Sequence, residues 1–312
     1  MAQPKNNTAL LKLNTGASIP SVGLGTWKST GVDDGYKSVI KALEVGYRHI
    51  DTAAIYKNED QVGKAINDSG VPRSEIFVTT KLWCTQQHNP KEGLEQSLKR
   101  LGLDYVDLYL MHWPVPLNPR SIKDGNYLTI PIKADGTRDV ETTSWNFIKT
   151  WELMQELPAT GLTRAIGVSN FSINNIKDLL ASPGNRITPA ANQVELHPLL
   201  PQQELIDFCK SKGIIVEAYS PLGSNNAPLL SEKTVIEVAK KNNVTPAEVV
   251  ISWHVQRGYV VLPKSVNADR ITSNLKTFSL SDEDFKAVSD ISKIEGEKRV
   301  VVPDWAPFVP FI

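Results

Sequence analysis

The chain has 312 residues, 41% of them hydrophobic and 22% charged, which allows either two modest domains or one barrel-sized domain. Lysine plus arginine number 34, the same as aspartate plus glutamate, so no strong field attracts nucleic acid or an anionic membrane. We therefore expect a small-molecule partner, with no nucleic acid and no membrane, and we expect the chain to act as a monomer.

Several features indicate the compartment. The N-terminal segment MAQPKNNTALL lacks the basic and apolar regions of a secretory signal, and no stretch approaches the length of a membrane span. The two cysteines, Cys84 and Cys209, are far apart and outside any paired-cysteine spacing, which favours a reducing environment over a disulfide. These features predict a cytoplasmic protein.

The first predicted elements are a hairpin, a helix and a strand. Weak alternation around a turn at residues 14–16 predicts a hairpin over residues 8–24. An apolar stripe at residues 36–43 then predicts a helix, which Gly46 ends before a short strand at residues 47–51. This helix and strand form the first unit of a repeating pattern.

The alternation of helices and strands continues along the rest of the chain. Short runs rich in branched or aromatic residues predict strands at residues 76–81, 106–112, 165–170, 191–196, 214–219 and 260–263, and a weaker one at 276–279. Helices with apolar stripes lie between them. Ser172 and Ser281 are predicted N-caps, and Thr245 and Glu248 form a capping box that opens a helix running to about Arg257.

Eight such strands predict a closed (β/α)8 barrel that forms a single domain over residues 1–312, with the hairpin sealing its bottom. An open doubly wound sheet is the alternative. The segment GLGTWK at 23–28 has only two glycines of that fold's fingerprint and does not open a helix. Residues 114–144, residues 221–230 and the tail from about 294 are predicted to be top-face segments that carry specificity.

Polar residues end nearly every predicted strand, and in a barrel those ends converge on one mouth. They are Asp51, Lys81, His112, Ser169, Asn170, Gln193, Tyr219 and Lys264. Lys81 and Asp51 can neutralise each other when buried. A lysine beside the Tyr56 hydroxyl is expected to lower the pKa of that phenol and suit it to proton transfer. Ordinary packing explains any one of these residues, but together they predict an active site.

A metal site is a competing interpretation of these strand ends. The sequence contains neither H-x-H nor H-E-x-x-H, and its supply of histidines at strand ends is small, so we predict no metal. Glu195 and His197, two residues apart, are interpreted as structural residues.

The segment LPKSVNADRITSN at 262–274 predicts a phosphate site. Asn267 can cap a short helix, and Lys264, Ser265 and Arg270 surround its start, where barrels often bind phosphate. Gly223 offers backbone amides for a second phosphate group. A solvated basic patch is the alternative.

Three segments resemble the signature regions of the aldo-keto reductase family, with greatest similarity to fungal NADP-dependent reductases. They are GYRHIDTAAIY at 46–56, GLTRAIGVSNF at 161–171 and LPKSVNADRI at 262–271, and the likeness covers essentially the whole chain. The resemblance implies the barrel fold and a catalytic tetrad of Asp51, Tyr56, Lys81 and His112. In family terms Tyr56 is the general acid, Lys81 and Asp51 tune it, and His112 orients the carbonyl.

The resemblance also implies NADPH/NADP+ as the cofactor. Ser169, Asn170 and Gln193 match residues that hold the nicotinamide carboxamide, and Tyr219 matches the one that stacks on its ring. Further positions that match the cofactor site are Thr26, Ser220, Leu222, Ser224, Lys264, Ser265, Arg270 and Asn274. The basic group near residues 264–270 favours NADPH over NADH, because it would otherwise face nothing anionic. Ser273 departs from the family, since many relatives carry an acidic residue there.

Four tryptophans match apolar positions of the substrate pocket, and core packing is their alternative. They are Trp27, Trp83, Trp113 and Trp305. The resulting prediction is NADPH-dependent reduction of aldehydes and ketones to alcohols. A cofactor-binding regulatory protein with little turnover is one alternative, which the intact tetrad opposes. A metal-assisted hydrolase is another, which the number of histidines opposes.

Overall fold

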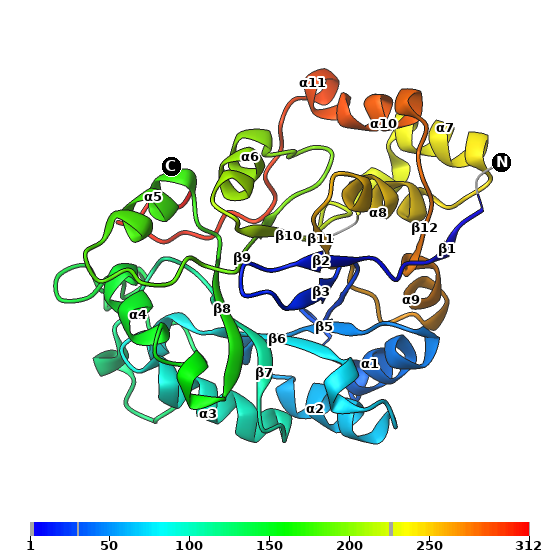
Figure 1. Cartoon of the computed structure of the whole chain (residues 1–312). Coiled ribbons are helices and arrows are strands. Elements are labelled where there is room, and N and C mark those ends of the chain that lie inside the picture. The colour runs from blue at the N-terminus through cyan, green and yellow to red at the C-terminus, as the bar shows by residue number, and fades with distance from the viewer. Residues whose placement is uncertain (1–2, 30, 225–226, 312) are drawn as a thin grey trace.

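The computed structural model describes residues 3–29, 31–224 and 227–311, and at its centre is a barrel of parallel strands surrounded by helices (Figure 1). Eight strands are hydrogen-bonded side by side in chain order. They are β4 (Leu24–Gly25), β5 (His49–Asp51), β6 (Phe77–Leu82), β7 (Val106–Met111), β8 (Thr163–Ser169), β9 (Ala191–Glu195), β10 (Ile215–Tyr219) and β11 (Val260–Val261).

The barrel closes next to its first and last strands. The amide of Val261 donates to the carbonyl of Ser21 at 2.8 Å, and the amide of Gly23 donates to the carbonyl of Val261 at 3.0 Å. Gly25 continues the seam by donating to the carbonyl of Pro263 at 3.0 Å. The predicted (β/α)8 fold is therefore confirmed, and the open sheet is excluded.

The predicted position of one barrel strand is wrong. The segment at 276–279 contains β12 (Lys276–Thr277), which pairs antiparallel with β1 (Lys5–Asn6) in a separate two-stranded sheet. The missing barrel strand is β4, which begins at the last residue of the predicted hairpin region at 8–24. A strand of two residues shows no periodicity of its own, and only its parallel pairing with β5 identifies it.

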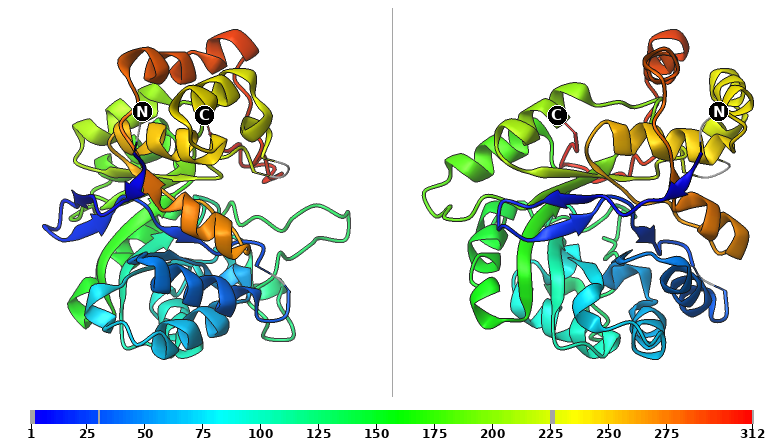
Figure 2. Two further views of the ribbon diagram at one scale, coloured as in Figure 1. Left: turned by 90° about the vertical axis from the view of Figure 1, so that its right-hand side faces the viewer. Right: turned by 45° about the vertical axis from the view of Figure 1, so that its right-hand side comes forward.

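The hairpin consists of β2 (Leu10–Lys12) and β3 (Ser18–Pro20), which pair antiparallel. Its turn is closed by Leu13, whose amide donates to the carbonyl of Ala17 at 2.9 Å, and Gly16 supplies the positive φ that the turn needs. Figure 2 shows the hairpin at one end of the barrel and the segment 114–144 at the other. The hairpin therefore seals the bottom, as predicted.

Helices cover the outside of the barrel. They are α1 (Asp34–Val45), α2 (Glu59–Asp68), α3 (Pro90–Leu101), α4 (Phe147–Met154), α5 (Ile173–Ala181), α6 (Gln203–Ser211), α7 (Lys233–Asn242), α8 (Pro246–Gln256), α9 (Ala268–Asn274), α10 (Asp282–Ser289) and α11 (Ile291–Glu295). The predicted caps are confirmed, because Ser172 caps α5, Ser281 caps α10, and Thr245 forms a capping box with Glu248 at α8.

A continuous cluster of buried apolar side chains extends between the strands and the helices, from Val22 to Ile291. Two large indoles within it keep their N–H groups paired. Trp253 donates to the Ser289 hydroxyl at 2.8 Å, and Trp151 donates to the Asn185 side chain at 3.1 Å. The strand ends are thus held on a rigid core.

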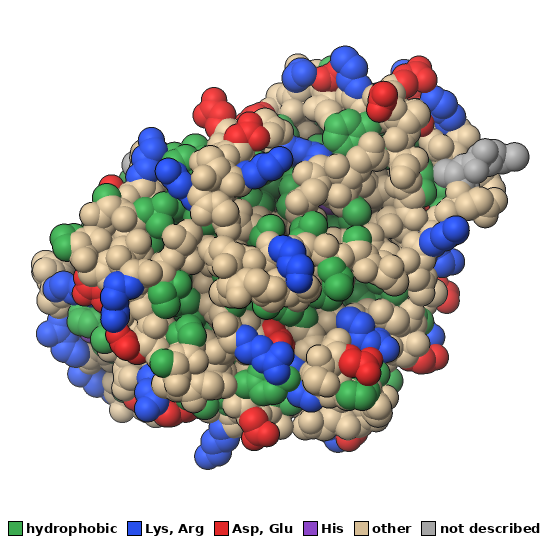
Figure 3. All heavy atoms as spheres, in the orientation of Figure 1, with side chains coloured by type: hydrophobic (Ala, Val, Ile, Leu, Met, Phe, Trp, Pro, Cys, Tyr) green, Lys and Arg blue, Asp and Glu red, His purple; other side chains and the backbone are tan. Residues whose placement is uncertain are grey.

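The surface charges, the helices and the cysteines can be compared with the partners and compartment predicted from the sequence. On the face shown in Figure 3, basic and acidic side chains are interspersed. Within the described part of the chain, no helix combines the length and apolar character that crossing a membrane requires. Cys84 and Cys209 are both free and buried. Residues 225 and 226 of the predicted top-face segment 221–230, and residue 312 of the tail, lie outside the described residues.

Gly63 lies where α2 meets the end of α3, and a Cβ there would lie 1.8 Å from the Leu101 carbonyl oxygen. A backbone carbonyl cannot move aside as a flexible side chain can. We therefore expect Gly63→Ala to lower the free energy of unfolding by about 3 kcal/mol, measured by urea denaturation. Gly93→Ala is the matched control, because its Cβ would meet side-chain atoms, nearest Leu82 Cδ1 at 2.9 Å. Equal losses for the two variants would contradict this account of the helix contact.

Candidate active site

The structure brings Asp51, Tyr56, Lys81 and His112 together at the C-terminal ends of β5, β6 and β7. The Lys81 ammonium donates to both carboxylate oxygens of Asp51, at 2.7 and 2.9 Å, and to the Thr52 carbonyl at 2.9 Å. It also donates to the Tyr56 hydroxyl at 3.4 Å. The His112 ring contacts the Tyr56 ring edge-on, with centroids 5.7 Å apart. The four residues predicted from the sequence therefore form one cluster.

Burial decides the protonation states in this cluster. It raises the pKa of Tyr56, and the opposing effect of Lys81 is smaller, so the expectation of a lowered phenol pKa is wrong. Burial, aided by Lys81, lowers the pKa of His112 well below its ordinary value. Burial also acts to lower the pKa of Lys81, but Asp51 and Tyr56 outweigh it and raise the pKa. The site thus holds a protonated phenol, a neutral imidazole and a charged ammonium.

Gln193 connects this cluster to a buried acid that the sequence analysis missed. Its amide nitrogen donates to Asp51 Oδ2 at 2.8 Å and to Glu217 Oε2 at 2.8 Å. Burial raises the pKa of Glu217 to about 7, and Asp51 acts in the same direction. Because both side-chain amide hydrogens are used, the side-chain oxygen Oε1 of Gln193 is left as the acceptor for a ligand. Glu217 lies in the predicted strand IIVEAY, where an acid at an interior position was the available signal.

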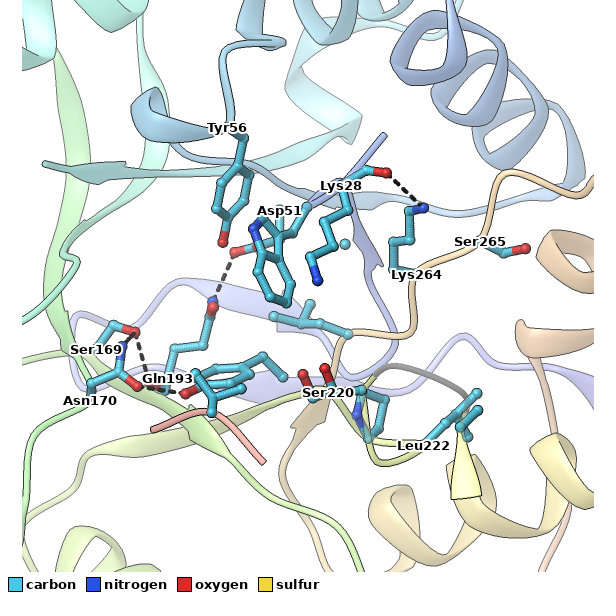
Figure 4. A pocket seen from close by; sticks show the side chains of 18 of the residues that line it. Lys28, Asp51, Tyr56, Ser169, Asn170, Gln193, Ser220, Leu222, Lys264 and Ser265 are labelled. Carbon is cyan, nitrogen blue, oxygen red and sulfur yellow. Dashed lines mark hydrogen bonds between the residues drawn. The ribbon is translucent and has the colours of Figure 1, made fainter. Parts of the chain in front are cut away.

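Ser169, Asn170 and Tyr219 form one side of the site. Asn170 donates to the His112 carbonyl at 2.9 Å and accepts from the Tyr219 hydroxyl at 2.7 Å. The Ser169 hydroxyl donates to the Gln193 carbonyl at 2.8 Å. Asn170 has a left-handed backbone with φ of 65°, which ends β8 sharply. These bonds fix the polar groups at the strand ends in place (Figure 4).

A cavity of about 790 Å³ opens above these residues. Nearly all the predicted cofactor and substrate residues line it, and these are Ser169, Asn170, Gln193, Tyr219, Ser220, Leu222, Ser224, Lys264, Ser265, Arg270, Asn274, Trp27, Trp83, Trp113 and Trp305. Asp51, Tyr56 and His112 line it as well. Lys81 is fully buried and is not among the lining residues. Thr26 is buried behind the lining, and its hydroxyl donates to the Asp51 carbonyl at 3.0 Å.

One end of the cavity is basic. Lys264, Ser265 and Arg270 lie around the start of α9, which Asn267 caps by accepting from the Arg270 amide at 3.0 Å. Lys28, which the sequence analysis did not select, lies beside Lys264 (Figure 4). The Lys264 ammonium donates to the Lys28 carbonyl at 3.1 Å. Lys28 belongs to the segment GLGTWK, which the sequence analysis considered only as an incomplete dinucleotide-binding fingerprint.

Trp83, Trp113 and Trp305 form an aromatic wall on another side of the cavity. Trp305, from the tail, lies 6.4 Å from Trp83 and 5.6 Å from Trp113 between ring centroids. Trp83 also contacts the His112 ring edge-on at 5.5 Å and donates to the Thr129 carbonyl at 2.7 Å. The wall therefore combines the barrel, the segment 114–144 and the tail. Trp27 differs from them because it lines the cavity with 40% of its surface exposed.

The tail is fastened by Glu195, which accepts from the amides of Val300 at 2.8 Å and Val301 at 2.7 Å. The His197 ring lies 2.9 Å from the same carboxylate. Burial acts to raise the pKa of Glu195, but these partners bring it below its ordinary value. Both residues have the structural role expected from the sequence, and through the tail they shape the cavity. Among the described residues, no group of three His, Cys, Asp or Glu side chains is placed to hold a metal ion.

Comparisons with known proteins agree with this fold. The model of the aldo/keto reductase family matches residues 21–293. The chain is 71% identical to glycerol 2-dehydrogenase (NADP(+)) and 66% identical to aldehyde reductase YPR1, both of Saccharomyces cerevisiae, with 98% of each chain covered in both cases. The aldose reductase structure from Schistosoma japonicum matches with a TM-score of 0.84 and 37% identity, covering 94% of each chain.

The chain belongs to the aldo/keto reductase family. The resemblance seen in the three sequence segments is therefore confirmed, together with the expectation of an oxidoreductase. The expected NADPH/NADP+ cofactor agrees with the name of the glycerol 2-dehydrogenase (NADP(+)) relative.

Glu217 gives the stability of the fold a pH dependence. Between pH 4.5 and about 7 the folded chain keeps a proton on Glu217 that the unfolded chain releases, so the residue's contribution to the free energy of unfolding falls as pH rises. Glu217→Gln removes this loss. The free energy of unfolding of the variant, relative to that of the wild type, is therefore expected to rise from pH 4 to 8, by at most about 3 kcal/mol. Urea denaturation across this range measures it.

The matched control is Glu237→Gln, because the Glu237 side chain is 65% exposed. Its difference from the wild type is expected to stay nearly constant with pH. A constant difference for Glu217→Gln as well would contradict the assigned protonation of the buried acid.

Proposed function

We propose that this chain reduces aldehydes and ketones to alcohols with NADPH, and that Tyr56 donates the proton to the carbonyl oxygen. One observation carries the proposal: a phenol whose pKa is raised lies at the base of a large cavity, within hydrogen-bond reach of a buried ammonium at 3.4 Å. A general acid must hold its proton until the reaction draws it away, and burial ensures that here. The same site allows the reverse oxidation at high pH.

The cavity lining supports NADPH as the cofactor. Lys28, Lys264 and Arg270 bring three cations to one end, which suits phosphate groups. We assign Lys264, Ser265 and Arg270 to the 2′-phosphate. The pyrophosphate is assigned to residues 220–224, toward which Lys28 extends (Figure 4).

The other end of the cavity suits the nicotinamide. Tyr219 offers a flat ring there, and Ser169, Asn170 and Gln193 offer hydrogen-bonding groups for its carboxamide. NADPH, when bound, supplies the hydride that reduces the carbonyl carbon. The protein holds the carbonyl beside it, and this proximity contributes much of the rate.

Residues of the chain donate the proton and stabilise the phenolate that remains. As the Tyr56 hydroxyl releases its proton, the Lys81 ammonium stabilises the phenolate, and Asp51 keeps the buried ammonium neutralised. His112 is neutral, so its ring can donate a hydrogen bond to the carbonyl oxygen without placing a second charge beside Lys81. The aromatic wall of Trp83, Trp113 and Trp305 excludes water from this step.

We also propose that the chain acts in the cytoplasm as a single-domain monomer, on a small-molecule carbonyl or alcohol and without nucleic acid. The balance of 34 basic and 34 acidic residues supports this part of the proposal.

Tyr56→Phe removes the proposed proton donor and little else. We expect turnover of glyceraldehyde to fall at least 100-fold, measured as NADPH absorbance at 340 nm, because a positioned acid contributes about that much or more. NADPH binding, followed by quenching of tryptophan fluorescence, should persist. Tyr36→Phe is the matched control, since the Tyr36 hydroxyl bonds Asp68 on the outside of the barrel.

Cofactor affinity that falls in parallel with activity would contradict the assigned role of Tyr56. NADPH binding by the wild type without turnover of any carbonyl would instead favour a regulatory function.

Arg270→Gln tests the choice between the two cofactors. Loss of a charged hydrogen bond costs about 1.5–3 kcal/mol, so we expect the KM for NADPH to rise about 10- to 100-fold while the KM for NADH changes little. Arg164→Gln is the control, because Arg164 lies at the N-terminal end of β8, whereas the cavity is at the C-terminal end. This variant should leave the KM values for NADPH and NADH unchanged. Equal increases for NADPH and NADH would show that Arg270 does not contact the 2′-phosphate.

A further inference from the structure

Among the described residues, four cationic side chains line the cavity. Lys28, Lys264 and Arg270 lie at its basic end and are accounted for by the cofactor phosphates in the function proposed above. The fourth, Arg138, comes from the segment 114–144 and lies at the aromatic wall. A cation on the substrate side has no role in hydride or proton transfer, so its presence there requires another explanation.

Arg138 packs directly on this wall. Its guanidinium carbon is 4.4 Å from the centroid of the Trp305 ring. Trp305 contacts Trp83, and Trp83 contacts the His112 ring at 5.5 Å. Contacts through two aromatic rings therefore connect the guanidinium to the place where the carbonyl is proposed to react, and both line the same cavity. The backbone of Arg138 is held by a bridge to Ile132 within the same segment, which fixes where the side chain starts.

The guanidinium is not fully paired within the protein. The Nη1 atom of Arg138 is buried and has no hydrogen-bond partner in the described part of the chain. The nearby acids in the sequence are engaged elsewhere. Asp139 accepts from Asn118 at 3.1 Å, and Glu141 forms an ion pair with Arg120 at 3.0 Å. A buried donor of a charged group without a partner costs free energy, and an anion that reaches it recovers that cost.

We propose that Arg138 forms an anion-binding subsite on the substrate side of the cavity, which favours aldehydes and ketones that carry a carboxylate several bonds from the carbonyl. The carbonyl of such a substrate lies at Tyr56 and His112, and its carboxylate reaches past the aromatic wall to Arg138. Guanidinium groups suit this task because their planar donors match a carboxylate. The inference rests on the proposed function and adds a substrate class to it.

A pair of substrates of the same size tests the subsite. We compare kcat/KM for 4-carboxybenzaldehyde and 4-methylbenzaldehyde with saturating NADPH, in the wild type and in Arg138→Gln. The wild type is expected to favour the carboxylate. The variant should lose about 10- to 100-fold on 4-carboxybenzaldehyde, mainly through KM, and less than about 3-fold on 4-methylbenzaldehyde, since only the charged hydrogen bond is lost.

Two further variants complete the experiment. Arg138→Lys keeps the charge and should recover part of the preference, which a loss of packing alone would not allow. Lys133→Gln removes one positive charge from an exposed position of the same segment that does not line the cavity, and it should change neither substrate. This control separates a local subsite from general attraction of anions.

The possible failures are distinguishable. Equal losses on both substrates in Arg138→Gln would overturn the subsite and assign Arg138 to packing against Trp305. A wild type that prefers 4-methylbenzaldehyde would also overturn it. A wild type that reduces neither substrate, nor any other carbonyl, would instead overturn the proposed function.

Discussion

The ion pair between Lys81 and Asp51 is the interaction on which the site depends. The Lys81 side chain is fully buried and that of Asp51 is 5% exposed, so neither charge is stable there without the other. The barrel makes the pair possible because β5 and β6 are neighbours whose ends meet at the same mouth. The same ammonium also donates to the Thr52 carbonyl and lies 3.4 Å from the Tyr56 hydroxyl. Losing either partner would leave an unpaired buried charge next to the reacting groups.

Burial then sets the other proton positions around this pair. The same removal of water that raises the pKa of Tyr56 lowers that of His112 and raises that of Glu217. The result is one charge pair surrounded by neutral donors and acceptors. Gln193 connects the two acids and keeps its side-chain oxygen as an acceptor for a ligand. Such a site can donate a proton to a carbonyl without first taking up a proton from water.

The cavity is lined partly by the barrel and partly by segments added to it. The nicotinamide and phosphate assignments depend on residues at strand ends and on the start of α9, which the barrel positions. The aromatic wall depends on the segment 114–144 and on the tail that Glu195 fastens through Val300 and Val301. Because the two parts are held by different contacts, substrate preference can change without disturbing the cofactor assignment. Arg138 belongs to the added part.

Much of the fold and site followed from the sequence, because strands and helices alternate with clear periodicity and the strand ends of a barrel converge. That is why Asp51, Lys81 and His112 could be grouped before any contact was known. The two-residue strand β4 could not be found in this way, since its only evidence is its pairing with β5.

The tertiary structure alone decided the chemistry of burial and the contacts between distant segments. The lowered pKa expected for Tyr56 reversed, because the sequence shows the neighbouring lysine but not the loss of water around the phenol. Glu217 and Arg138 were not selected from the sequence either, since an acid within a strand and an arginine in a polar segment acquire meaning only from what surrounds them. The sequence by itself determined which polar groups gather at the barrel mouth, while the three-dimensional packing determined their charge and their partners.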